Sequence, residues 1–508
     1  MEVLKGHIRH AFHEMNNELE RLELIDTLQR LGIAHFFQSE IKEELDTISS
    51  NSLGMINEDD LHATALKFRL LRQQGYMISQ GGTDVFSCFR EDPGNFKQSV
   101  WRDMKGMLSL YEASYLSFQG ETVLDEAQAF AKKHLQDLQG EGDPKLQMLI
   151  HRALELPLHW RNPRTESRWY IETCEKTGNT DPAALELAKP EFNTVQSMMQ
   201  KELQDISRWW HKLGLQKKLS FSRDRIVECF LFSLGMVGHG SHLRHARHEI
   251  TKVNQLITTI DDIYDVYGSL DELELFTDAV DRWDLNTVEQ LPDYMQLCFL
   301  ALYNSANGAA YHAFKELGCN SPPYIKKAWA DLCKGYSVEA KWYNSKYTPT
   351  VNEYLEHSWR TIGITIVVTY IYFMQGENVT KEGLDGLENY ADLIRLGCLI
   401  FRLNDDLATS KDEMARGDVP KAIQCYIHEK GISESAAREE VAVVISETWK
   451  KLNEVRLNCT SFCGSYSDAV MNTTRSSHYV YQFGDGFGAP GNETEDRLMG
   501  LLVQPIPL

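Results

Sequence analysis

The chain has 508 residues, more than one hydrophobic core ordinarily serves, so two domains are expected. Hydrophobic residues make up 43% of it and charged residues 25%, which is typical of a folded globular protein. The 73 acidic and 52 basic residues leave a net charge of −21, which excludes a cationic surface for nucleic acid or for an anionic membrane. A local group of basic residues would therefore be expected to bind a small anion rather than a polymer.

Apolar residues recur at helical spacing along most of the chain, whereas strand-like alternation is rare. The pattern predicts an all-α fold with one helical domain at 1–200 and a second at 201–508. The longest apolar stretch, 362–373, is shorter than the roughly 20 residues of a membrane span, so it predicts a buried helix. Ten scattered cysteines lack zinc-site spacing and are interpreted as reduced, mostly buried thiols.

The first local basic group is formed by Arg223 and Arg225, which flank Asp224. Arginine offers planar, paired donors to phosphate oxygens, so this triplet could grip a diphosphate. Salt bridges within a helix or between domains are the alternative, and they would be preferred if no metal motif accompanied the triplet.

The strongest motif is the carboxylate group Asp261, Asp262 and Asp265, which follows an almost uncharged segment. On an α-helix, Asp261 and Asp265 lie about 40° apart, so both would face one side and could share a cation. A solvated acidic helix face is the alternative. Because 253–260 should be buried, we expect the carboxylates at the mouth of a cavity, where Mg²⁺ would compensate their charge.

A second candidate metal group is Asp405, Thr409 and Glu413, which recur every four residues and would share one helix stripe. Two carboxylates and a hydroxyl suit Mg²⁺, which keeps waters and phosphate oxygens among its ligands. This spacing alone is more often that of a surface helix. Arg402 precedes the group and Lys421 follows it, so both could hold a diphosphate beside the metal.

These motifs together resemble plant class I terpene synthases, and specifically their monoterpene branch. The sequence DDIYD at 261–265 is similar to the first metal motif of that family, with Asp262 supporting the two ligands. DDLATSKDE at 405–413 is similar to its second metal motif. The residues that match diphosphate-binding positions are Arg223, Arg225, Arg402 and Lys421. The resemblance covers nearly the whole chain, including 158–170 and 481–488.

The resemblance implies a C-terminal class I terpenoid synthase helical barrel that holds the active site, and an N-terminal α-barrel domain without one. It implies a carbon–oxygen lyase acting on geranyl diphosphate, with three Mg²⁺ ions per site and Mn²⁺ as the alternative ion. It leaves a homodimer open. It implies the plastid stroma as location. The tandem arginine and tryptophan usual in monoterpene members are absent, which predicts that this chain starts after the transit peptide and that element.

Ionisation of an allylic diphosphate produces a carbocation, which needs an apolar and aromatic wall. Phe232 and Tyr481 are candidates for this wall, although aromatic residues at helical spacing are more often plain core. Thr258 is a further cavity candidate. Asn254 lies two helical turns before Asp261 and within about 20° of its stripe, so it should face the cavity. We predict that it positions the water that captures an α-terpinyl cation, giving α-terpineol or 1,8-cineole; a hydrogen bond to a neighbouring helix is the alternative.

Three other functions fit parts of the pattern. A prenyl-chain elongating enzyme would be shorter and would carry two DDxxD motifs, whereas the second motif here is of a different kind. A sesquiterpene synthase acting on farnesyl diphosphate would differ mainly in cavity size. A non-enzymatic helical scaffold would suit the acidic charge but leaves the clustered arginines unexplained.

Overall fold

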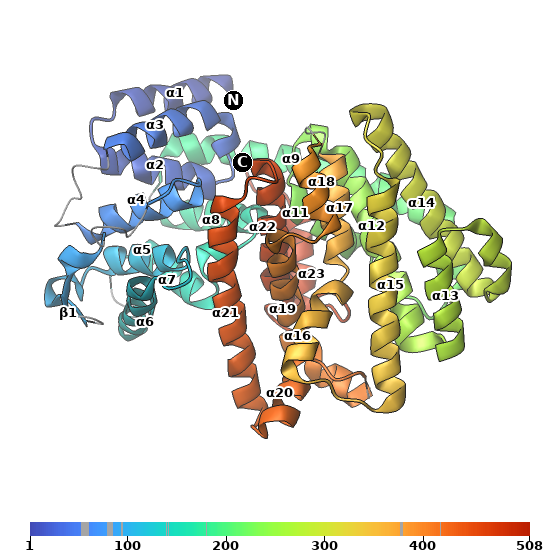
Figure 1. The fold of residues 1–508 in the computed structure, drawn as a ribbon. Helices are drawn as coiled ribbons and strands as arrows, with labels where there is room; N and C mark the ends of the chain where they lie inside the picture. The colour runs from blue at the N-terminus through green and yellow to red at the C-terminus, as the bar shows by residue number, and fades with distance from the viewer. Residues whose placement is uncertain are drawn as a thin grey trace. The chain divides into compact units, whose positions relative to one another are not determined.

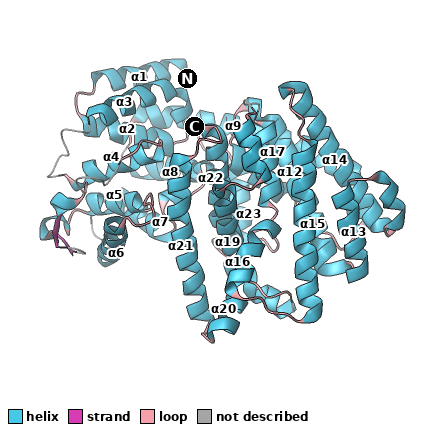
Figure 2. Cartoon of the chain, viewed as in Figure 1, coloured by secondary structure: helices cyan, strands magenta, loops and turns pink. Residues whose placement is uncertain are grey.

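The computed structural model describes residues 1–51, 60–78, 85–92, 95–138, 140, 142–178, 180–375, 379–416 and 418–508. Within these ranges the chain is almost entirely helical, so the all-α prediction is confirmed (Figure 2). The exception is a short hairpin in which β1 (Arg90–Asp92) pairs antiparallel with β2 (Asn95–Phe96). Among the described helices, none is both long and apolar enough to cross a membrane.

In chain order, the helices run from α1 near the N-terminus to α23 near the C-terminus (Figure 1). Those up to Leu213 are α1 (Glu2–Glu14), α2 (Glu18–Arg30), α3 (Gln38–Asn51), α4 (Leu61–Gln73), α5 (Met104–Ser114), α6 (Thr122–Asp137), α7 (Pro144–Glu155), α8 (Pro163–Thr177) and α9 (Pro182–Leu213). The following helices are α10 (Leu215–Lys218), α11 (Ile226–Val237), α12 (Arg244–Asp262), α13 (Leu270–Arg282), α14 (Asp293–Leu317), α15 (Pro322–Ser345), α16 (Val351–Thr361), α17 (Ile364–Met374), α18 (Lys381–Glu388), α19 (Asp392–Arg416), α20 (Ala422–Lys430), α21 (Glu434–Asn458), α22 (Gly464–Tyr481) and α23 (Asn492–Leu498). Short 3₁₀ turns are η1 (Ala34–Phe36), η2 (Ser87–Phe89), η3 (Gln98–Val100), η4 (Leu158–Trp160), η5 (Ser241–Leu243) and η7 (Leu285–Gln290), and π turns are η6 (Ile263–Tyr267) and η8 (Met499–Val503).

The chain divides into two compact units. The first unit comprises Met1–Ser197, Asn453–Asn458 and Val503–Leu508, and the second comprises Met198–Leu452 and Cys459–Leu502. The domain boundary predicted after residue 200 stays a prediction.

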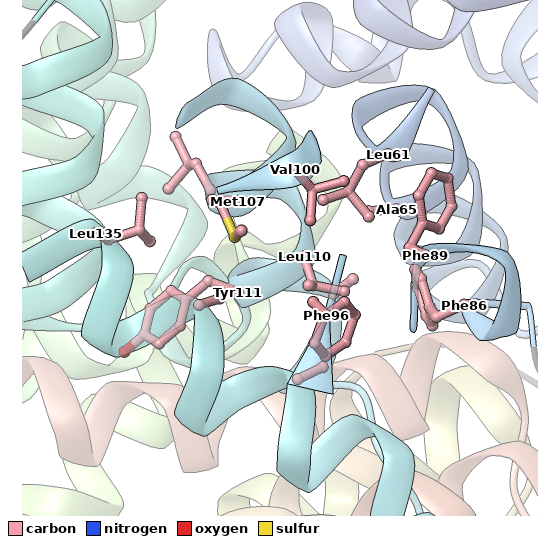
Figure 3. Packing of buried hydrophobic residues seen from close by; sticks show 14 of the residues in the cluster. Leu61, Ala65, Phe86, Phe89, Phe96, Val100, Met107, Leu110, Tyr111 and Leu135 are labelled. Carbon is pink, nitrogen blue, oxygen red and sulfur yellow. The ribbon is translucent and has the colours of Figure 1, made fainter. Parts of the chain in front are cut away.

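The first unit is built around an apolar cluster from α4, α5, α6, α7 and the hairpin (Figure 3). Figure 3 shows Phe86, Phe89 and Phe96 gathered at one end of this cluster, with Met107 and Tyr111 farther along it. These aromatic and aliphatic side chains are almost fully buried, so their removal from water is the main stabilising contribution of this core.

Helix caps in this unit follow from local sequence. Asp143 accepts a hydrogen bond from the backbone of Leu146 while Pro144 begins α7, and Asn162 does the same for α8 ahead of Pro163. A proline at the first helical position needs no hydrogen bond there, so both sequences fix where their helix begins.

In the second unit, helices form a closed ring around a central space. α11 packs against α12 and α22, α12 packs against α17, and α19 packs against α17 and α22, while α15 contacts α16 and α17. Every residue of α17 is buried, which confirms the buried helix predicted from the apolar stretch near 362–373. All ten cysteines are free and six are buried, as their interpretation as reduced thiols requires.

Candidate active site

A cavity of about 830 Å³ lies inside the second unit, within the size range of small-molecule sites. Its walls come from α11, α12, α15, α19 and the loop between α22 and α23. Of the site residues predicted from the sequence, the structure brings these to the wall: Arg223, Phe232, Asn254, Thr258, Asp261, Asp262, Asp265, Arg402, Asp405, Thr409, Glu413, Lys421 and Tyr481. Arg225 is not among them.

The first carboxylate group departs from the helix geometry expected for it. α12 ends at Asp262, and the next five residues form the π turn η6, in which the backbone N–H of Gly268 donates to the carbonyl of Ile263 at 2.8 Å. The angle of about 40° between Asp261 and Asp265 therefore does not apply, because a π turn places more residues in each turn. Both side chains nevertheless line the cavity.

Arg223 is bound by two of these aspartates. Its Nη2 donates to Asp261 Oδ2 at 2.6 Å, its Nε donates to Asp262 Oδ1 at 2.7 Å, and its backbone N–H donates to Asp262 Oδ2 at 2.7 Å. Asp262 is only 2% exposed. Its carboxylate thus fixes both the backbone and the side chain of Arg223, which is a supporting role rather than that of an open ligand.

Asp265 lines the cavity and has neighbours of the same charge. The protein packed around it raises the pKa of its carboxyl well above the usual range, and the nearby Asp261 carboxylate raises it further, while Lys421 opposes both. A cation bound beside Asp265 would therefore stabilise the charged form of its carboxylate.

The second candidate group lies on α19. Thr409 is buried and its hydroxyl donates to the backbone carbonyl of Asp405 at 3.0 Å, which leaves the oxygen lone pairs for another partner. Burial raises the pKa of Asp405 to about 8, although Arg402 opposes the change. Burial also raises the pKa of Glu413, against the pull of Lys421. Within the described residues, Glu413 Oε2 is buried without a hydrogen-bond partner.

These carboxyl groups fit a site for a divalent cation. Raised pKa values and an unpartnered buried oxygen indicate negative charge that the protein alone does not compensate. The donors from both groups are carboxylate and hydroxyl oxygens, which Mg²⁺ prefers over nitrogen and sulfur.

Arg402 lies next to the second group and is itself almost fully buried. Its Nη1 donates to Asp405 Oδ2 at 2.9 Å and lies 3.5 Å from Asp406 Oδ1. Asp406 accepts a hydrogen bond of 2.6 Å from the hydroxyl of Tyr354. Asp406 is therefore committed to internal partners, whereas Asp405 faces the cavity, and this difference separates two adjacent aspartates that look alike in sequence.

Glu339 is a site residue that sequence reasoning missed. It lies on α15, lines the cavity, and accepts a hydrogen bond of 2.7 Å from the hydroxyl of Thr361. Burial alone would raise its pKa, but Lys421, His357 and Arg402 lower it to about 2. No motif marks Glu339, since only the fold brings it to Lys421; its position inside a buried helix stretch was the available signal.

Aromatic side chains also line the cavity. The rings of Phe232 and Phe487 lie 5.1 Å apart, and those of Phe401 and Tyr481 lie 6.0 Å apart. Aromatic faces can stabilise positive charge without attacking it. Phe487 was not singled out from the sequence, although it lies within the segment 481–488 that carried the family resemblance.

Asn254 is a polar residue of α12 that lines the same cavity. It is 9% exposed, and among the described residues its Nδ2 is buried without a hydrogen-bond partner. The alternative of an Nδ2 hydrogen bond to a neighbouring helix is therefore not observed. The amide faces a cavity in which a water or a ligand could accept its hydrogen bond.

Comparisons with known families agree with this geometry. Residues 211–451 match the model described as terpene synthase family, metal binding domain, and residues 1–154 match the model described as terpene synthase, N-terminal domain. The first match contains both carboxylate groups of the cavity.

Individual relatives are similar over the whole chain. A chloroplastic α-thujene synthase of Litsea cubeba is 50% identical, over 99% of this chain and 86% of that protein. A (−)-α-terpineol synthase of Vitis vinifera is 49% identical, over 100% of this chain and 86% of that protein. Isoprene synthase of grey poplar, solved with three Mg²⁺ ions and dimethylallyl-S-thiolodiphosphate, is 43% identical with a TM-score of 0.93, covering 100% of this chain and 96% of that one.

Proposed function

Because the chain belongs to the terpene synthase family and is similar throughout to plant monoterpene synthases, we propose that it converts geranyl diphosphate to a monoterpene in the presence of Mg²⁺. In reaction terms it is a carbon–oxygen lyase that releases inorganic diphosphate. The observation that carries the proposal is that one cavity is lined by both carboxylate groups, by basic side chains and by aromatic rings.

The metal would be held by Asp261 and Asp265 on one wall and by Asp405, Thr409 and Glu413 on the other. Bound there, Mg²⁺ supplies positive charge to the departing diphosphate. Three ions are proposed because the grey poplar isoprene synthase structure contains three. Asp262 and Asp406 would not bind metal. Asp262 instead holds Arg223 in place, and Asp406 holds Arg402.

The diphosphate would be gripped by Arg223, Arg402 and Lys421, whose side chains reach the cavity wall beside the carboxylates. Without substrate, Arg223 lies against Asp261, Arg402 lies against Asp405, and Lys421 is close to Glu413 and Glu339. Once Mg²⁺ compensates these carboxylates, the three cations can turn toward the diphosphate without leaving a buried carboxylate unpaired. Glu339 would help to orient two of these basic side chains. It accepts a hydrogen bond from Thr361, which in turn accepts one from Arg402, and its carboxylate attracts Lys421.

The organic part of the substrate would lie against Phe232, Phe487, Phe401 and Tyr481. These residues exclude water while the cation rearranges. Thr258 donates its hydroxyl to the backbone carbonyl of Asn254 at 2.9 Å, so its hydroxyl proton is already engaged within α12. Asn254 is the proposed position for the water that terminates the reaction, which favours an oxygenated monoterpene.

The family resemblance and the chloroplastic names of relatives support a plastid location. We propose geranyl diphosphate as the partner molecule, with no nucleic acid and no membrane.

The test is diphosphate release from geranyl and farnesyl diphosphates with Mg²⁺ or with EDTA, followed by gas chromatography of the products. We expect Mg²⁺-dependent release with a higher kcat/KM for geranyl diphosphate. An equal or higher kcat/KM for farnesyl diphosphate would make the protein a sesquiterpene synthase. No release from either substrate would favour the scaffold alternative.

A further inference from the structure

Arg225 has a different environment from the arginine two residues before it. Arg223 lines the cavity and contacts Asp261 and Asp262, whereas Arg225 is absent from the cavity wall. Its Nη2 instead donates to the backbone carbonyl of Gly488 at 2.8 Å. Its backbone N–H donates to Gln255 Oε1 at 2.9 Å, which anchors its main chain to α12.

The Gly488 carbonyl belongs to a compact turn between α22 and α23. Asp485 Oδ1 accepts hydrogen bonds from the backbone N–H of Gly488 at 2.6 Å and of Phe487 at 3.2 Å. A Cβ atom on Gly488 would lie only 2.3 Å from Asp485 Oδ2, so a side chain there would displace the Asp485 carboxylate. Both polar groups of Gly488 are thus occupied, the N–H by Asp485 and the carbonyl by Arg225.

This turn carries a part of the cavity wall. Phe487 packs on Phe232 of α11, and Asp485, Phe487 and Gly488 all line the cavity. The Arg225–Gly488 hydrogen bond therefore joins the segment before α11 to the segment after α22, on the side where the aromatic wall must exclude water.

The buried Nε of the half-buried Arg225 also points to a structural constraint. Among the described residues, its Nε is buried without a hydrogen-bond partner, and an unsatisfied buried donor is unfavourable. Two hydrogen bonds offset this cost. Nη2 donates to the Gly488 carbonyl, and Nη1 donates to the Asp224 carbonyl at 3.2 Å.

We propose that Arg225 is a positioning residue that holds the turn 484–489, and with it Phe487, against α11, while Arg223 is the arginine of the pair that grips diphosphate. This inference rests on the proposed function for its effect on products. The contact itself is a property of the protein without substrate. Loss of the contact frees the turn, lets water reach the cation early, and raises the share of acyclic alcohol among the products.

The experiment compares Arg225→Met with Arg223→Met, with Arg208→Met as control, since Arg208 is an exposed arginine paired with Asp205. Two quantities are measured on the substrate-free protein: hydrogen exchange of residues 482–491 and the affinity for inorganic diphosphate with Mg²⁺. For Arg225→Met we expect exchange to accelerate about tenfold, as for a lost charged hydrogen bond, with diphosphate affinity near wild type. For Arg223→Met we expect hydrogen exchange of residues 482–491 near that of the wild type and a weakened affinity for diphosphate.

Gly488→Ala tests the same contact from the other side, because its methyl group would displace Asp485 while both arginines stay intact. It should reproduce the faster exchange and the acyclic alcohols of Arg225→Met. The proposal is overturned if Arg225→Met weakens diphosphate binding as much as Arg223→Met does, or if exchange of 482–491 is unchanged in either turn variant. Should the wild type release no diphosphate, the exchange data still decide the positioning role separately.

Discussion

Two buried carboxyl groups, Glu166 in the first unit and Asp405 in the second, have opposite electrostatic environments. In the first unit, Glu166 lies between Arg30 and Arg161, with hydrogen bonds of 2.6 Å and 2.9 Å. Burial alone would raise the pKa of Glu166, but these guanidinium groups lower it to about 2. In the second unit, burial raises the pKa of Asp405 to about 8, because its neighbours include Glu413 and Asp406 as well as Arg402.

Two buried amides show the same contrast. In the first unit, the Nδ2 of Asn453 donates to the carbonyls of Tyr115 and Ser117, and its Oδ1 pairs with His159 at 2.8 Å. In the second unit, the Nδ2 of Asn254 has no partner among the described residues. A polar group satisfied by the protein stabilises the fold, whereas one left short of partners indicates a position for a ligand.

The largest expected effect comes from breaking the second unit's carboxylate set. We predict that Asp265→Asn lowers kcat by about a thousandfold or more, because it removes a ligand needed to stabilise the leaving diphosphate. The melting temperature should stay near that of the wild type, since no apolar area is lost. Asp278→Asn, an exposed aspartate on α13, is the matched control. Near-wild-type turnover in Asp265→Asn would remove the first motif from the metal site.

The reverse outcome is predicted for the first unit. Glu166→Gln should lower the free energy of unfolding by about 3 to 5 kcal/mol, since it removes the buried carboxylate that Arg30 and Arg161 share. Product distribution of the folded enzyme should not change. Urea denaturation and gas chromatography measure the two effects, and an altered product ratio without lost stability would contradict the contrast between the units.

Substitutions of the two buried amides, Asn453 and Asn254, should have smaller effects. Replacing Asn453 by Leu should lower the free energy of unfolding by about 1 to 3 kcal/mol, since it removes the amide that bonds the carbonyls of Tyr115 and Ser117 and the ring of His159. Replacing Asn254 by Ile should leave stability near wild type and shift products from alcohols or ethers to hydrocarbons such as limonene or sabinene. The water-positioning role fails if the wild type already makes hydrocarbons alone, or if the oxygenated fraction is unchanged in the variant.

The sequence predicted those features that depend on local spacing. The carboxylates of α19 fall on one helix stripe because helical geometry relates residues four apart, whatever the rest of the fold does. The same argument was wrong in detail for Asp265, since the π turn η6 could not be read from its residues. Glu339 and Phe487 were missed because only tertiary packing brings them to the cavity. The Arg225 contact with a backbone carbonyl leaves no signal in the side chains at all.

The smallest effect concerns a buried group that the second unit keeps neutral. Burial lowers the pKa of His478 to about 3, and its Nε2 accepts a hydrogen bond of 2.9 Å from Trp449. The unfolded chain takes up this proton near pH 6.5 and the folded chain does not, so stability falls as pH drops below 6.5, by about 1.4 kcal/mol per unit. Denaturation curves between pH 7 and 5 should show this slope in the wild type, and a shallower one in His478→Gln. Equal slopes would remove His478 as its source.

The most direct test of uncompensated charge in the cavity is calorimetric binding of inorganic diphosphate in the presence and absence of Mg²⁺. We predict binding that requires Mg²⁺ in the wild type and in Glu166→Gln, measured at a temperature where the variant is folded, and loss of that binding in Asp265→Asn and Glu413→Gln. Mg²⁺-dependent binding of equal strength in all four proteins would contradict the account, because the cavity carboxylates would then not be the groups that await a cation.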